Sequence, residues 1–220
     1  MAEINNETPI KIPKKDERLA ELVGIILGDG SIYKSKERSM YELRIAGHSI
    51  DDKEYLINYV GSLIEELFGI KVRLYFFKNK KCLHIKAQGV RLISYLEKIG
   101  LISGNKVKND VGIPQWILDS KEFTKCCIRG LIDTDGGVYD CGNGSLFPRI
   151  GFCSYIPQLR NDFRNSLLNL GFFPLKWIMK TKTAIYRKKE VFRYIEEIGF
   201  SNPKHIKRLK MLLDSNAPVV

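Results

Sequence analysis

The sequence lacks an apolar run long enough to cross a membrane, for which about 20 residues are needed. Its first seven residues contain neither a basic nor an apolar stretch, so no signal peptide is expected. None of its five cysteines forms a C-x-x-C pair, which argues against a structural zinc site. An odd number of cysteines without a secretory signal fits reduced thiols, and Cys126 and Cys127 are expected in the core. We therefore expect an intracellular, cytoplasmic protein.

Positive charge, by contrast, is abundant. The 36 lysines and arginines outnumber the 25 acidic residues, giving a net charge of +11 and a pI near 9.4. The excess extends over both halves of the chain. A strongly basic domain suggests a polyanionic partner such as nucleic acid or an anionic membrane surface. Charge that only maintains solubility is the alternative, so charge alone favours nucleic acid slightly.

The chain contains an internal repeat. Residues 19–30 and 125–136 share the order Gly, four residues, Asp-Gly. Further along, residues 95–100 and 194–199 both begin with Tyr and end with Ile-Gly. Because internal repeats determine architecture, two copies about half a chain apart predict a duplicated domain. A phosphate-binding P-loop is not expected, since no lysine precedes Ser31 after the glycines of the first copy.

Each copy is predicted to fold in the order α-β-β-α-β-β-α. In the first copy the expected elements are a helix at 17–27, strands at 31–34 and 41–47, a helix capped by Ser49 or Asp51, strands at 71–76 and 82–86, and a helix at 90–99. In the second copy they are a helix at 121–134, strands near 137–141 and 147–153, a helix at 157–170, strands near 174–180 and 182–187, and a helix at 189–198. A last helix is expected at 204–213. The predicted division is an N-terminal arm at 1–16, flexible or disordered, subdomains at 17–100 and 121–213, a linker at 101–120 and a tail at 214–220.

Alternation along the strands indicates two different faces. Leu74 and Phe76 are expected to cover helices, whereas Arg73 and Tyr75 face outward. Any half-buried sheet exposes polar residues. The bias toward basic and aromatic residues in both halves nevertheless favours a sheet that lies in the DNA major groove.

The repeated Asp-Gly pairs suggest a shared site. A single such Asp is most often a solvated turn residue. Two copies with the same inner glycine are harder to dismiss, because Gly24 and Gly130 would each cost about 1 kcal/mol in mid-helix relative to alanine. That cost makes sense if the two helices cross backbone to backbone. Asp29 and Asp135 would then emerge close together and form an oxygen-rich site suited to Mg²⁺.

Residues 22–30 and 128–136 resemble the two motifs of LAGLIDADG homing endonucleases, and the second copy is the closer match. The resemblance covers roughly residues 17–213. Flanking stretches resemble the archaeal intron- and intein-encoded branch: Gly104-Asn105-Lys106, Ile113-Pro114 with Trp116, and residues 198–204. An intein itself is not expected, because the chain ends carry no splicing nucleophile and no terminal His-Asn pair.

The resemblance implies an α+β fold, in which duplicated αββαββα subdomains form a pseudo-twofold saddle of two antiparallel sheets. It also implies a monomeric, intron-encoded or freestanding enzyme that cleaves a long asymmetric DNA target by Mg²⁺-dependent hydrolysis. Two or three ions would be shared by the paired Asp residues, with Mn²⁺ able to substitute. The target would be about 20 bp of double-stranded DNA, contacted in the major groove.

The resemblance assigns roles to individual residues. Asp29 and Asp135 would bind metal beside Gly28 and Thr134, and Gly24 and Gly130 would form the subdomain interface. Lys86 would act near the end of the fourth strand; in the second half Ile185, Tyr186 and Arg187 compete for that position, and Lys180 or Lys182 can substitute. His48 and Ser154 are candidates to position water. The expected DNA contacts are Tyr33, Arg44, Arg73, Tyr75, Lys80, His84, Tyr139, Arg149, Trp177, Lys180 and Lys182.

Two other functions fit the same resemblance. One is an intron RNA maturase. The other is a non-cleaving DNA-binding regulator, which would be expected to lose a metal-binding acid or to gain a helix-turn-helix module; the sequence contains neither change.

Overall fold

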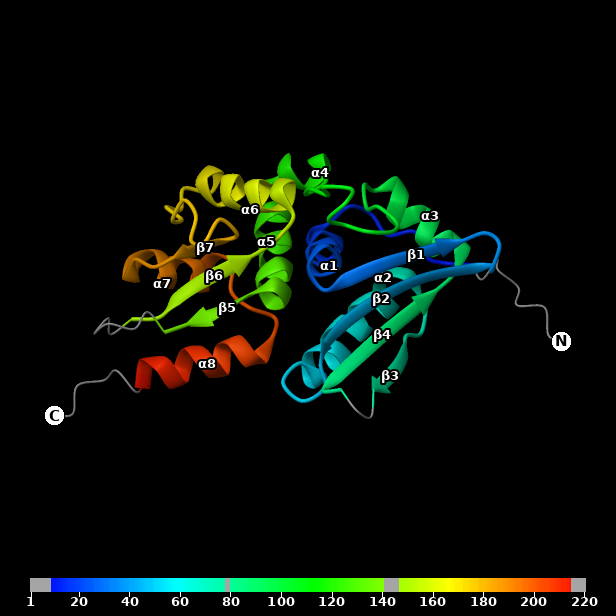
Figure 1. The fold of residues 1–220 in the computed structure, drawn as a ribbon, viewed down its shortest axis with the longest axis horizontal. Helices are drawn as coiled ribbons and strands as arrows, with labels where there is room; N and C mark the ends of the chain where they lie inside the picture. The colour runs from blue at the N-terminus through cyan, green and yellow to red at the C-terminus, as the bar shows by residue number, and fades with distance from the viewer. Residues whose placement is uncertain (1–8, 78–79, 141–146, 215–220) are drawn as a thin grey trace.

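The computed structural model describes residues 9–77, 80–140 and 147–214. Cys141, the first eight residues of the predicted arm and residues 215–220 of the predicted tail lie outside the described residues. Figure 1 shows two helices, α1 and α5, between two sets of strands. Among the described residues, no helix is both long and apolar enough to span a bilayer.

The first half contains one four-stranded antiparallel sheet in the order β1-β2-β4-β3. We call it sheet A. Its elements in chain order are α1 (Glu17–Gly28), β1 (Gly30–Ser35), β2 (Met40–His48), a π-helix (Tyr55–Gly61) that continues into α2 (Ser62–Phe68), β3 (Arg73–Phe77), β4 (Cys82–Gln88) and α3 (Val90–Lys98). The αββαββα order expected for the first copy is confirmed.

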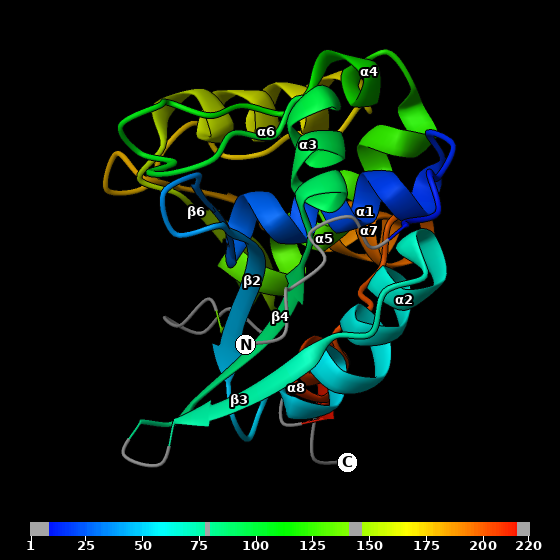
Figure 2. The same ribbon diagram turned by 90° about the vertical axis from the view of Figure 1, so that its right-hand side faces the viewer.

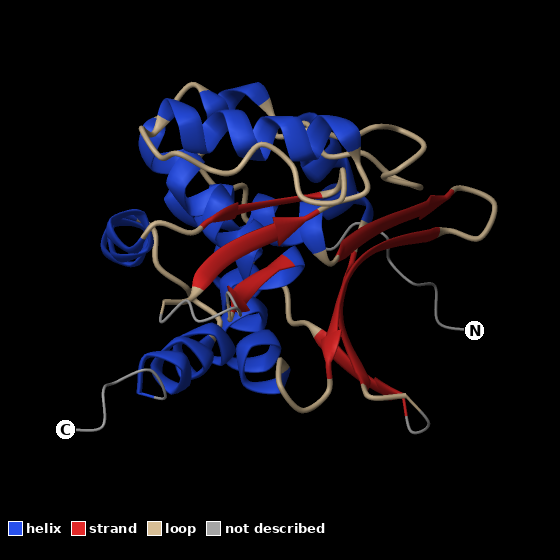
Figure 3. Cartoon of the chain, turned by 60° about the vertical axis from the view of Figure 1, so that its left-hand side comes forward, coloured by secondary structure: helices blue, strands red, loops and turns tan. Residues whose placement is uncertain are grey.

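The second half contains a three-stranded antiparallel sheet in the order β5-β6-β7, here called sheet B. A short helix α4 (Gln115–Leu118) precedes the second half. The elements of the second half are α5 (Lys121–Asp135), β5 (Gly136–Tyr139), β6 (Arg149–Cys153), α6 (Pro157–Asn169), β7 (Lys182–Ile185), α7 (Lys188–Glu197) and α8 (Pro203–Asp214). Figure 3 shows the two sheets as separate groups of strands, with helices above them and at the lower left.

The strand predicted near 174–180 is wrong. Only one isolated bridge, between Ile178 and Lys182, forms there. Met179 and Lys180 both have positive φ values, of 52° and 63°. Non-glycine residues rarely adopt this conformation, and two in succession cannot extend a strand. The second sheet therefore has one strand fewer than the first.

Glycines allow α1 and α5 to cross at backbone distance. A Cβ atom on Gly24 would lie 2.2 Å from the carbonyl oxygen of Cys127, and one on Gly130 would lie 2.4 Å from that of Glu21. Buried apolar residues of both helices surround the crossing, among them Leu22, Ile25, Ile128 and Leu131. The C-terminal ends of the two helices therefore lie next to one another.

The glycines after the two helices act through close approach. Gly30 and Gly136 do not have positive φ values. Instead, a Cβ on Gly30 would lie 2.5 Å from the Cα atom of Ile26, and one on Gly136 would lie 2.7 Å from the Cα of Ile132. Each glycine thus lets the chain turn back over its own helix into the following strand.

Two expectations about the first half need correction. All of β3 is exposed, including Leu74 and Phe76, which were expected to cover helices. Figure 2 shows β3 at the outer edge of sheet A, beyond β4. In addition, residues 10–15 are not a free arm. The backbone of Lys11 donates to Phe68, and the Tyr95 hydroxyl donates to the carbonyl of Pro13.

Candidate active site

Two carboxylates occupy equivalent positions at the ends of the crossed helices. Asp29 is the residue that follows α1, and Asp135 is the last residue of α5. Burial is the main cause that raises the pKa of Asp135, to about 6, and the negative charge of Asp29 raises it further. The pKa of Asp29 is also raised, mainly by burial. The two groups therefore form one partly buried acidic pair.

Lys106 contributes positive charge at this pair. Its ammonium group donates to the carbonyls of Leu27 at 2.8 Å and Ile26 at 3.3 Å, and also to that of Gly28. These carbonyls belong to the last turn of α1, where the helix itself provides no hydrogen-bond partner. Burial lowers the pKa of Lys106, and the charges of Asp135 and Asp29 oppose that shift.

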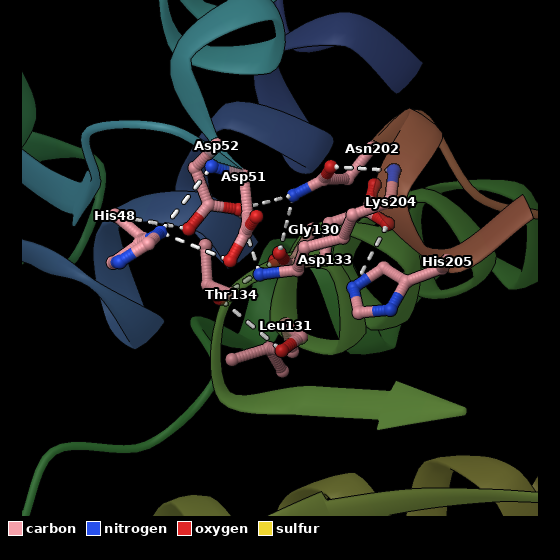
Figure 4. Close-up of polar contacts among 10 residues, drawn as sticks. All are labelled: His48, Asp51, Asp52, Gly130, Leu131, Asp133, Thr134, Asn202, Lys204 and His205. Atoms are coloured by element: carbon pink, nitrogen blue, oxygen red, sulfur yellow. Dashed lines mark hydrogen bonds and ion pairs between the residues drawn. The ribbon is translucent and has the colours of Figure 1, made fainter. Parts of the chain in front are cut away.

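Lys204, from the second half of the chain, also lies near the pair. It lies in the first turn of α8, and its charge lowers the pKa of Asp29. Its Nζ atom is 2.7 Å from Oδ1 of Asp52. The same Asp52 accepts hydrogen bonds from the Asn202 side chain and from the His48 backbone (Figure 4). Both donor–acceptor distances are 2.9 Å. Asp52 thus connects the end of β2 to the start of α8.

The sequence contained a signal for these two lysines that the residue assignments did not use. Ile-Gly follows α3 in the first half and α7 in the second, and each Ile-Gly is followed within a few residues by an asparagine and a lysine. The lysines are Lys106 in one copy and Lys204 in the other. These stretches, which resemble a branch of the family, each deliver a lysine to the acidic pair.

Lys86 has different neighbours. Its ammonium group lies 3.4 Å from Glu42 and 4.1 Å from the centre of the Tyr75 ring. The ladder pairs Lys86 with Arg44, which pairs with Ser31. In sheet B the corresponding ladder runs Gly137, Gly151, Ala184. Ala184, and not Ile185, Tyr186 or Arg187, is therefore the second-half counterpart of Lys86.

The two candidates to position water have structural partners. The Nδ1 atom of His48 accepts from the Asp51 backbone at 3.3 Å and lies 2.9 Å from the Asp51 carboxylate. Ser154 is buried, and its hydroxyl accepts from the backbone of Ile156 just before α6. The Thr134 hydroxyl donates within its own helix, to the carbonyls of Gly130 at 2.8 Å and Leu131 at 3.2 Å.

Most of the expected DNA contacts share one face of each sheet. In sheet A the register aligns Tyr33, Arg44, Arg73, Tyr75 and His84 on the face that also carries Lys86. In sheet B it aligns Tyr139, Arg149 and Lys182. Lys80 is in the turn before β4 and is exposed.

The outer face of sheet B contains a hollow of about 170 Å³. Tyr139, Gly151, Met179 and Ala184 form part of its lining. Trp177 belongs to the segment where the expected strand is missing. Its ring contacts the guanidinium groups of Arg160 and Arg164 on α6, with the Arg160 group 5.2 Å from the ring centre.

No family model matches the chain, and neither does any curated protein. Solved structures do. A mesophilic variant of the homing endonuclease I-DmoI is 18% identical over 83% of this chain and 95% of its own, with a TM-score of 0.58. I-DmoI in complex with DNA and Mn has the same identity and TM-score. Full-length DUF199/WhiA from Thermatoga maritima is 16% identical over 95% of this chain and 64% of its own, with a TM-score of 0.56. The chain therefore has the LAGLIDADG fold.

Proposed function

We propose that this protein is a homing endonuclease that cuts double-stranded DNA at a specific site. The observation that carries the proposal is the pair of carboxylates Asp29 and Asp135. They lie between the two sheets, at the C-terminal ends of α1 and α5, which cross at their glycines. Asp29 has both Lys106 and Lys204 nearby, and Asp135 has Lys106 nearby. The outward faces of the sheets add arginine, lysine and aromatic side chains suited to a nucleic acid duplex.

The residues present fit a divalent cation of the Mg²⁺ type, held by Asp29 and Asp135. Among residues 9–77, 80–140 and 147–214, no group of three or more His, Cys, Asp and Glu side chains gathers as a metal cage. The two carboxylates of Asp29 and Asp135 suit Mg²⁺, which usually takes one or two carboxylates and completes its shell with water and phosphate oxygens. When bound, such ions supply Lewis acidity and an activated water for phosphodiester hydrolysis. We expect two or three ions, with Mn²⁺ able to substitute.

The chain's own residues would then hold the substrate and balance charge. Lys106 and Lys204 are positioned to stabilise negative charge that develops on phosphate oxygens beside the two carboxylates. The positive faces of the sheets would bind the phosphate backbone and fix the duplex in register. Lys86, held by Glu42 and Tyr75, is better suited to contact DNA than to act on the reacting atoms.

The comparisons support this proposal at the level of fold. I-DmoI has been solved with DNA and Mn, with DNA and Ca, and with its target DNA in the presence of Mg. By analogy we propose an intracellular monomer, intron-encoded or freestanding, whose two subdomains at 17–100 and 121–213 each contact one half of a target of about 20 bp.

The direct test is cleavage of a randomised duplex library in Mg²⁺, followed by sequencing of the cut ends. Wild-type protein should cut both strands at one site. Asp29→Asn and Asp135→Asn should abolish double-strand cleavage and leave binding largely intact, because the sheets hold the duplex. Asp119→Asn, an exposed change with the same loss of charge, is the matched control. Full cleavage by both active-site variants would contradict the mechanism, whereas one nicking variant would mean two partly independent sites.

A second candidate function, a non-cleaving DNA-binding regulator, is favoured by one observation. The carbonyl of Gly28, expected beside the metal, already accepts a hydrogen bond from Lys106. The two WhiA structures have the same fold and are not described as nucleases. Sequence-specific binding without cleavage in either Mg²⁺ or Mn²⁺ would support this function. Selective binding of intron RNA over duplex DNA would instead indicate a maturase.

A further inference from the structure

The basic outer face of sheet A contains a buried acid. Glu42 lies on β2, and its side chain is only 3% exposed. The ladder aligns it with Tyr33 on one side and Gln88 on the other, on the same face as Arg44 and Lys86. A carboxylate on a surface that binds a polyanion would weaken binding unless it has another task.

Three neighbouring side chains converge on Glu42. The Nε and Nη2 atoms of Arg44 donate to Oε1 at 3.1 and 2.5 Å. The Gln88 amide donates to Oε2 at 2.9 Å, and the Lys86 ammonium lies 3.4 Å from Oε1. Burial alone would raise the pKa of Glu42. The hydrogen bonds from Arg44 and Gln88 outweigh burial and hold that pKa below its ordinary value, so the acid is ionised at neutral pH.

We propose that Glu42 is a positioning residue that fixes Arg44 to recognise a guanine in one half of the DNA target. The inference rests on the proposed DNA-binding function. A guanidinium group is planar and has two usable edges. Glu42 holds the edge formed by Nε and Nη2, which leaves the edge formed by Nη1 and Nη2 for a second acceptor. Paired donors of this kind match O6 and N7 of guanine in the major groove.

The surroundings of Arg44 fit a preorganised reader. Its side chain remains 38% exposed although two of its donors are bound. Lys86 is 16% exposed and is confined between Glu42 and the Tyr75 ring. An arginine already held in place loses less conformational freedom when it binds, so more of the contact energy is available to distinguish bases.

Among the described residues, the ladder positions of sheet B that match this cluster carry different side chains. By ladder position, Arg149 takes the place of Glu42, Gly151 that of Arg44, and Ala184 that of Lys86. Gly151 and Ala184, which stand at the positions of Arg44 and Lys86, have no long polar side chain. The effect of Glu42 should therefore be confined to the half of the target that sheet A contacts, and the other half provides an internal control.

The test is selection of bound duplexes from a randomised library by wild-type protein, Glu42→Gln and Glu37→Gln. Both variants remove one negative charge, but Glu37 is an exposed residue between β1 and β2. Wild-type and Glu37→Gln should select guanine at the same base pair. The preference of Glu42→Gln for guanine over the other bases at that pair should be about tenfold weaker than that of the wild type. This is near the lower end of the discrimination that one bidentate contact supplies. Arg44→Lys, which keeps the charge but not the fork, should lose the same preference.

A second measurement separates positioning from folding. Replacing the selected guanine by 7-deazaguanine removes the N7 acceptor, which should weaken binding of the wild-type protein but not of Glu42→Gln. An unchanged preference in Glu42→Gln, or an equal loss in both half-sites, would overturn the inference while the proposed function stands. If the wild-type protein selects no sequence at all, the proposed function fails and the inference fails with it.

Discussion

At the scale of single residues, the acidic pair is balanced by two lysines from equivalent places in the repeat. Replacement of Lys106 or Lys204 by Met should lower the rate of DNA cleavage by about 10²-fold or more, as expected when a charged group beside the reacting atoms is removed. Lys108→Met and Lys207→Met are matched controls at exposed positions near each lysine. Single-turnover kinetics on one duplex would measure the effect. Equal rates for test and control variants would mean that neither lysine acts at the site.

The raised pKa of Asp135 predicts how metal binding depends on pH. Because this pKa is about 6, the carboxyl holds a proton below pH 6 that a bound cation must displace. Mg²⁺ or Mn²⁺ should therefore bind more weakly as pH falls from 7 to 5, and binding should release protons near pH 6. Calorimetry in buffers of different ionisation enthalpy measures this release. The dependence should weaken in Asp135→Asn, and an unchanged dependence would assign the proton to another group.

Asp133 provides a separate prediction about stability. It is almost completely buried, and burial is the first cause that raises its pKa, to about 8. In the unfolded chain an aspartate has a pKa of about 3.9. The folded protein therefore keeps a proton that the unfolded chain has lost, and this group lowers the free energy of unfolding as pH rises from about 4 to about 8. Asp133→Asn should reduce that decline. Urea unfolding at pH 5, 7 and 9 is the measurement, and parallel curves for both proteins would contradict it.

At the scale of secondary-structure elements, the crossing of α1 and α5 determines where the acids lie. Gly24→Ala and Gly130→Ala would force a Cβ into backbone atoms of the facing helix. Overpacking of this kind costs about 1–3 kcal/mol. Gly61→Ala is the control, because its Cβ would lie no closer than 3.3 Å to a Val72 methyl group. Thermal unfolding of the three variants should rank Gly61→Ala as the most stable. Equal melting temperatures would mean that the helices tolerate separation.

At the scale of the whole molecule, two unlike halves should recognise an unlike pair of half-sites. One copy of the protein should bind about 20 bp, since each half follows the major groove for about one turn. Affinity should fall by roughly 10³ or more between 50 and 200 mM salt if six or more phosphates are neutralised. Sedimentation of the complex and footprinting at several salt concentrations would test this. A dimer bound to a short palindrome would contradict the arrangement of two halves in one chain.

The sequence by itself determined the duplication, the helix pair with its inner glycines, and the two terminal acids. These features depend on local patterns: apolar periodicity defines a helix, alternation defines a strand, and a glycine in mid-helix marks a close approach. The four strands of sheet A were predictable for the same reason. The absence of the strand expected near 174–180 could not be predicted in this way. It depends on the positive φ values at Met179 and Lys180, which the local sequence pattern does not reveal.

Only the tertiary structure decided which charges meet. Lys106 and Lys204 are 77 and 69 residues beyond the acids they follow in the chain, yet the fold brings them to the same acidic pair. Strand register likewise placed Ala184, and not a basic residue, at the position in sheet B that Lys86 occupies in sheet A, and it brought Arg44 and Gln88 next to Glu42. A one-dimensional pattern gives the face of each strand, but contacts between strands depend on register, which the packed core fixes.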